Sequence, residues 1–114
     1  RKRTPKPKQD PEQLCEAFLA SVPEEIYAEL PSDIVGVMES VTEDVLVAFP
    51  RLVKRPLVVR ALVARRVQAH YKAVGWEFDE ERCRAFLDLL IEYLPIFIGL
   101  LSVKHPTIAA ALAA

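Results

Sequence analysis

The side chains of this sequence that could do chemistry are cations, and they are concentrated in two blocks. Residues 1–8 carry five and residues 51–76 carry seven, and neither block contains Asp or Glu. Clustered Lys and Arg without acidic neighbours can neutralise a phosphate polymer, and Arg suits this role because its guanidinium group binds phosphate through two donors. The pattern predicts nucleic-acid contacts from Arg1, Lys2, Arg3, Lys6, Lys8, Arg51, Lys54, Arg55, Arg60, Arg65, Arg66 and Lys72.

The acidic residues are segregated as strongly as the basic ones. Residues 9–50 contain ten Asp or Glu and no Lys or Arg, and residues 77–92 contain six acids against Arg82 and Arg84, so the net charge of −1 conceals the separation. A second interpretation therefore stays open, in which an acidic helix pairs with the basic one inside the bundle or across a subunit interface. The arm at 1–8 could likewise be a solubilising tail, or lie on a neighbour's acidic block.

The motifs of common enzymes are missing from the sequence. There is no GxxxxGK[ST], GxGxxG, GxSxG or HExxH pattern. The two histidines, His70 and His105, have the pattern of surface or capping residues, and Cys15 and Cys83 have no metal-ligand spacing. We expect no enzymatic activity, no metal and no cofactor, and two buried free thiols, with a disulfide as the alternative.

Proline and capping residues divide the chain into helices that would position the cations. Helices are expected at 11–21, 23–30, 33–49 (with Ser32 as its cap), 56–74, from 80 onward and 106–114. Gly75 fits the end of the fourth helix, Asp79 the start of the fifth, and Pro95 should kink or break the fifth. The run DVLVAF could form a strand, but no partner strand is evident. We predict an all-α fold, a bundle of five to six helices (11–114) behind an extended basic arm (1–10).

The basic helix has cations on both sides of an apolar stripe. At about 100° per residue, the stripe contains Val63, Ala64, Val67, Tyr71 and Val74. Arg65 and Lys72 flank it on one side and Arg66 and His70 on the other, while Arg60 falls on the stripe itself. This arrangement suits a helix held between a core and a polyanion. Tyr71, Trp76 and Phe78 could stack on bases, but packing in the core is the better interpretation.

The chain is more apolar than a small monomer usually is, with 52% hydrophobic residues. A chain of 114 residues has too much surface to hide that much apolar material, so neighbouring subunits are expected to cover part of it. The apolar far end supplies the expected subunit interface, which comprises Phe86, Leu90, Tyr93, Ile96, Phe97, Leu100, Leu101, Ile108 and Leu112.

Composition also bears on environment. The absence of Asn is typical of proteins from hot environments. No apolar segment follows the basic start, so we expect no secretory signal peptide. The longest uncharged apolar run, 93–103, is about half the length that a membrane-spanning helix needs, so no membrane span is expected.

The plan of the chain resembles the major capsid proteins of rod-shaped and filamentous viruses of hyperthermophilic archaea. The resemblance lies in the basic start RKRTPKPK, the helical region rich in Ala, Val and Leu, and the apolar end LPIFIGLL…TIAAALAA. It implies a segment that wraps double-stranded DNA, a bundle that packs into a helical shell, and, in some members, a second related coat protein. The acidic 9–50 block departs from that plan, so only the arm and the basic helix carry over as phosphate contacts.

These observations lead to three hypotheses about function. The first is a structural protein of a virion, assembled in the host cytoplasm, that coats duplex DNA without regard to sequence and self-assembles into a filament, as a homo-oligomer or with a related coat protein. The second is an all-α protein–protein interaction subunit without nucleic acid. The third is a small DNA-binding regulator, which is disfavoured because the basic helix lacks polar base-reading side chains.

Overall fold

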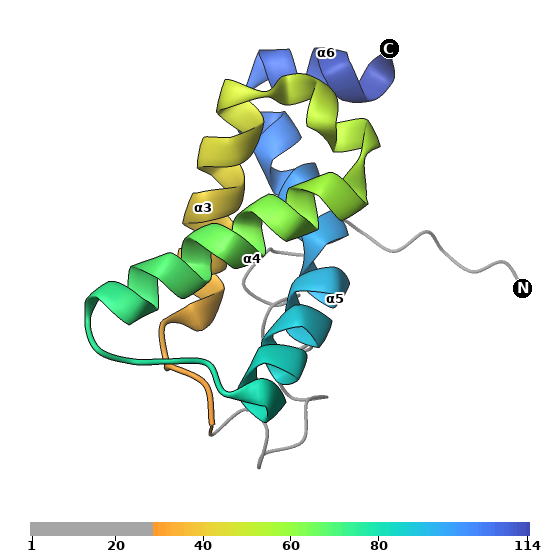
Figure 1. Ribbon diagram of the computed structural model, residues 1–114. Coiled ribbons are helices and arrows are strands. Elements are labelled where there is room, and N and C mark those ends of the chain that lie inside the picture. Colours follow the sequence, from red (N-terminus) through yellow and green to blue (C-terminus); the bar gives the residue numbers. More distant parts are fainter. Residues whose placement is uncertain (1–28) are drawn as a thin grey trace, which may run out of the picture.

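The computed structural model describes residues 29–114, in which every regular element is helical. The elements are α3 (Ile34–Ala48), the 3₁₀ helix η1 (Pro50–Lys54), α4 (Pro56–Ala73), α5 (Glu80–Lys104) and α6 (Pro106–Ala113) (Figure 1). The all-α class is confirmed over this range, and the strand alternative for DVLVAF is wrong because α3 contains nearly all of it. The arm, the helix expected at 11–21 and most of the one expected at 23–30 lie outside the described residues.

Three prolines set the corners of the chain. Pro50, Pro56 and Pro106 each occupy the first turn of a helix, where the ring's fixed φ fits and the missing N–H would have had no partner. The residue before each proline lies outside the helical region of φ and ψ, as proline requires of its predecessor. The chain therefore turns sharply at each one, and α6 packs back against η1 and α5.

The turn between α4 and α5 follows the expected capping chemistry. Gly75 has φ of +88°, a conformation that strains residues with a Cβ, and the Asp79 side chain accepts a hydrogen bond of 2.8 Å from the backbone N–H of Arg82. The cap expected from Ser32 is wrong. Asp33 occupies the N-cap of α3 without a side-chain cap bond, because its carboxylate accepts a hydrogen bond from the hydroxyl of Tyr71 instead.

Helix α5 does not break at Pro95. It runs without interruption from Glu80 to Lys104, and the exposed proline leaves the carbonyl of Ile91 without its usual intrahelical donor. Eight α5 residues are buried, and they lie on both sides of Pro95. Packing against the core therefore holds both halves of the helix. The helix is also long and apolar enough to cross a membrane by length and composition alone, which is equally true of some core helices of soluble proteins. The expectation of no membrane span stays a prediction.

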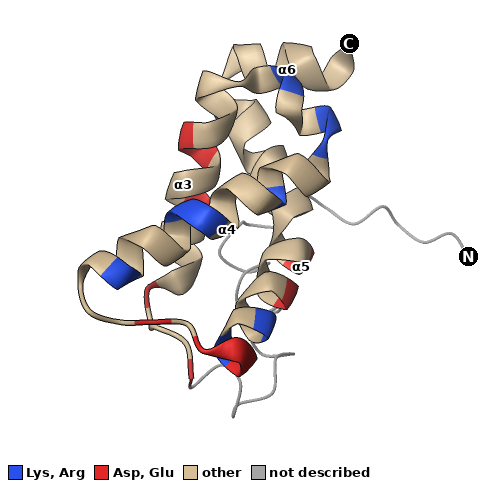
Figure 2. Cartoon of the chain, viewed as in Figure 1, with Lys and Arg blue, Asp and Glu red and all other residues tan. Residues whose placement is uncertain are grey.

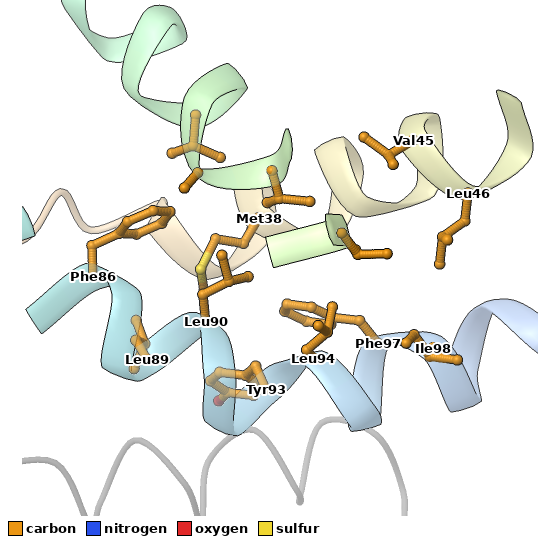
Figure 3. Packing of buried hydrophobic residues seen from close by; sticks show 14 of the residues in the cluster. Met38, Val45, Leu46, Phe86, Leu89, Leu90, Tyr93, Leu94, Phe97 and Ile98 are labelled. Carbon is orange, nitrogen blue, oxygen red and sulfur yellow. The ribbon is translucent and has the colours of Figure 1, made fainter. Parts of the chain in front are cut away.

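The core lies where α3, α4 and α6 meet α5. Figure 3 shows Met38 and Leu46 of α3 directed toward the buried side chains of α5. On α5, Tyr93 and Phe97 stack with ring centroids 5.2 Å apart. The only buried polar side chain among the described residues, Thr42, is satisfied by the carbonyl of Met38 at 2.6 Å.

Most of the residues expected at a subunit interface lie in the core of the chain itself. Six of the nine have almost no surface to offer a neighbour, because the chain's own helices cover them. They are Phe86, Leu90, Tyr93, Phe97, Leu101 and Ile108. Ile96 and Leu100 are half-buried, and Leu112 is exposed. Only these last three keep surface for contact with a second subunit.

The three glycines give opposite expectations for stability. A Cβ added at Gly36 or Gly99 meets no other atom within 4 Å, so Ala there should raise the free energy of unfolding by up to about 1 kcal/mol each, the difference in helix propensity. At Gly75 the positive φ should make Ala destabilising by about 1–2 kcal/mol. Urea denaturation of the three variants checks the signs. A stabilising Gly75→Ala would contradict the left-handed turn.

Candidate nucleic-acid interface

Six of the seven cations of block 51–76 are exposed and follow η1 and α4. We call them the basic ridge, and they are Arg51, Lys54, Arg55, Arg65, Arg66 and Lys72. Figure 2 shows Lys and Arg spread along α4 and around η1, whereas Asp and Glu gather on α3, before α5 and on the first turns of α5. The charge separation of the sequence is therefore a separation in space. The arm cations Arg1, Lys2, Arg3, Lys6 and Lys8 lie outside the described residues.

The cations of α4 are held by the packing of its opposite face. Val59, Val63 and Val67 recur every four residues and are fully buried, so they fix the rotation of the helix. Arg65 and Lys72 are seven residues apart, close to two turns, and both are exposed on the side away from this stripe. A buried valine stripe thus aims two cations in one direction from a rigid element.

The ridge does not pair with the acidic block in the described part of the chain. The ion pairs there join Arg82 to Glu29 at 3.2 Å and to Asp79 at 3.9 Å, and join Lys104 and His105 to Glu43. No ridge cation takes part, and Lys54 instead donates to the carbonyl of Ala114 at 2.7 Å. The alternative in which the basic helix is neutralised by its own bundle therefore fails for residues 29–114. Pairing between subunits stays open.

Glu43 illustrates where the acids of α3 are used. Its Oε2 lies 2.6 Å from Nε2 of His105 and 3.3 Å from Nζ of Lys104. The hydrogen bonds from His105 and Lys104 hold the pKa of the Glu43 carboxyl below its ordinary value of 4.5, against a smaller opposing effect of burial. This acid joins α3 to the end of α5 and has no contact with the basic ridge.

The lowered pKa gives a testable pH dependence. Because the folded chain binds the Glu43 proton less tightly than the unfolded chain, its contribution to stability is present at neutral pH and is lost as pH falls below about 4.5. Glu43→Gln should lower the free energy of unfolding by less than about 1 kcal/mol at pH 7, since the groups are partly exposed, and by less at pH 3 than at pH 7. Urea midpoints at both pH values measure this, and an equal loss at both would contradict it.

The aromatic residues after α4 pack on one another. Trp76 and Phe78 meet edge to face with centroids 4.7 Å apart, Phe78 lies 5.2 Å from Phe86, and the guanidinium of Arg82 covers the Trp76 ring at 5.1 Å. Tyr71 is buried, and burial together with its hydrogen bond to Asp33 raises the pKa of its hydroxyl far above the ordinary value. The interpretation as core packing is confirmed for this cluster.

Arg60 differs from the rest of its block. It lies on the core side of α4, one turn before Ala64 and two before Val67, and it is half-buried. There it lines an apolar groove of about 420 Å³ together with Val53, Pro56, Leu57, Ile91, Leu94, Pro95, Ile98, Gly99 and Leu112. Sequence reasoning noticed a cation on the apolar stripe but missed the groove. The one sequence pattern that could have predicted the groove is the spacing of Ile91, Pro95 and Gly99. It places a proline ring and a residue without a side chain on one face of α5.

The remaining candidate chemistry is sparse in the described residues. No group of three His, Cys, Asp or Glu side chains could hold a metal ion within residues 29–114. Cys83 is a half-buried free thiol whose Sγ lies 3.5 Å from Nε2 of Gln68, and Cys15 lies outside this range. Comparison of the chain with protein-family models, with curated proteins and with solved structures gives no match.

Proposed function

We propose that this chain coats nucleic acid, binding duplex DNA through its phosphates without regard to sequence. The basic ridge supplies the described contacts, and the arm at residues 1–8 adds its five cations. The carrying observation is that six exposed cations follow η1 and α4 and none forms an ion pair within residues 29–114. Exposed cations without a carboxylate partner, three of them held on α4, gain most from a polyanion, because each neutralised phosphate releases a condensed counterion.

The dimensions of α4 suit a phosphate backbone. An 18-residue helix is about 27 Å long, and the seven residues from Arg65 to Lys72 rise about 10 Å. One strand of duplex DNA carries one charge per roughly 3.4 Å of axis, so this interval spans about three phosphates of that strand. The exposed side of α4 offers few groups that could read bases, because its other exposed positions are mainly Ala, Leu and Val. Such contacts position a protein on DNA but do not specify a sequence.

Self-assembly is the second part of the proposal. Large apolar side chains remain at the surface on several elements, among them Val103 at 86% exposure, Val74 at 71% and Phe49 at 52%. Head-to-tail contacts between such side chains build an open filament when the rotation from one subunit to the next does not close a ring. Together with the resemblance of plan to archaeal rod-shaped virus coats, this supports a place in a virion, with a second related coat protein as an alternative partner.

The exposed apolar surface also favours one rival. An interaction subunit of a larger complex would use the same apolar side chains, and its basic ridge would face an acidic partner protein. Competition binding with unrelated duplexes of equal length separates the two functions. A coat protein should bind all of them within about twofold and form filaments along long DNA in electron micrographs. Failure to bind any duplex at low salt would support the interaction subunit, and strong preference for one site would support a regulator.

A further inference from the structure

The apolar groove between η1, α4, α5 and α6 has no role in the proposed DNA contacts. Its walls are formed by apolar residues and Gly99, apart from one charged residue, Arg60. Its volume of about 420 Å³ lies toward the lower end of the 300–1,000 Å³ typical of small-molecule sites. A polar sugar–phosphate chain would lose hydration in such a groove without gaining hydrogen bonds. The site therefore calls for a ligand of different chemistry.

The groove is built into the sequence of α5. Ile91, Pro95 and Gly99 are spaced by four residues, so they share one face of the helix. Gly99 contributes no side chain, and a Cβ built there meets no atom within 4 Å. Leu57 belongs to α4 and forms part of the opposite wall, and it is 69% exposed. Apolar surface on both walls with open space between them fits an alkyl chain.

Arg60 indicates which polar group the ligand should carry at one end of its alkyl chain. It is half-buried, and it forms no hydrogen bond or ion pair with any other residue of the described chain. A guanidinium that is partly removed from water and has no carboxylate partner is left under-solvated, and a planar anion that accepts two hydrogen bonds relieves this. A carboxylate has that geometry.

We propose that the groove binds one monomeric, single-chain fatty carboxylate, with the alkyl chain between α4 and α5 and the carboxylate on the guanidinium of Arg60. The volume suits one alkyl chain. The inference is independent of DNA binding, since Arg60 lies on the core side of α4 and the ridge residues Arg65 and Lys72 lie on the other side.

The test titrates the full chain with linear carboxylates of 8, 10 and 12 carbons and with the matching alcohols, by calorimetry below their micelle concentrations. The carboxylate affinity should rise about fourfold per methylene until the groove is full, the factor that corresponds to 0.8 kcal/mol. Each carboxylate should bind about tenfold tighter than its alcohol, as a charged hydrogen bond predicts. Equal affinities for acid and alcohol, or no dependence on chain length, would overturn the proposal.

Three variants locate the site. Arg60→Gln should remove the preference for the acid and leave alcohol binding unchanged, whereas the control Arg65→Gln should change neither. Gly99→Leu should fill the groove and abolish both, with helical content and DNA affinity retained. Unaltered carboxylate binding in Arg60→Gln and Gly99→Leu would overturn the assignment. The proposal would also be overturned if the unmodified chain bound no ligand and Gly99→Leu changed the oligomeric mass. That result would assign the groove to contact with a second copy of the chain.

Discussion

Replacing Arg65 and Lys72 together with Gln should lower the affinity of the full chain for duplex DNA by about a hundredfold at roughly 0.1 M salt. Each neutralised phosphate contributes about 0.9 to the logarithmic salt slope, which is close to a factor of ten per cation at that concentration. Both side chains are exposed and have no partner within residues 29–114, so their loss should leave the fold unchanged. Fluorescence anisotropy with a labelled duplex measures the change.

A matched control removes the same charge elsewhere. Arg84 is exposed, lies on α5 and takes part in no ion pair among the described residues. Arg84→Gln should weaken binding less than twofold, because only the general field of the protein changes, whereas Arg65→Gln alone should weaken it close to tenfold. If these two single variants bind DNA equally, phosphate contact by α4 is contradicted, and net charge alone drives binding.

Replacing Phe97 with Ala should have the largest effect on stability, a loss of about 3–5 kcal/mol in the free energy of unfolding. Phe97 is 1% exposed, stacks on Tyr93 and lies in the second half of α5 among the core side chains (Figure 3). Its removal leaves a cavity that rigid helices on several sides cannot close. Domains of this size are stable by roughly 5–15 kcal/mol, so the variant should unfold at much lower urea concentration.

Phe49 provides the control for this prediction. It is the same residue type, it caps α3 and it is half-exposed. Phe49→Ala should cost far less than Phe97→Ala, within about 1 kcal/mol, since little packing is lost. Equal losses for the two variants would contradict the position of α5 as the centre of the core, and would return Phe97 to the subunit interface that its sequence context predicts.

The ends of α4 and α5 could be predicted from sequence because local chemistry fixes them. Pro56, Gly75 and Asp79 each act within one turn of their own position, through a fixed φ, a positive φ and a side-chain cap. The exposure of the α4 cations Arg65, Arg66 and Lys72 was also predictable, since the valine stripe of α4 determines which way they face. Ser32 is not the cap because α3 begins at Ile34 with Asp33 at its N-cap, and the Asp33 carboxylate is engaged by Tyr71, a residue 38 positions away.

The spacing of apolar residues along a helix could not predict which elements pack against its apolar face. The pattern of α5 shows that Phe86, Leu90 and Phe97 avoid water, but α3, α4 and α6 of the same chain do the covering, and no local signal distinguishes them from a neighbouring subunit. Arg60 could not be separated from its block for the same reason. Its position relative to α5 depends on the packing of two helices, which the sequence of α4 alone does not contain.

The salt dependence of DNA binding by the unmodified chain tests the central claim most directly. Observed association constants for one duplex should be measured from about 50 to 300 mM salt and plotted logarithmically. Six ridge cations on phosphates predict a slope of about −5, and engagement of the arm makes it steeper. A slope near zero, or no binding at the lowest salt, would contradict the proposal that the basic ridge lies against a polymer of phosphates.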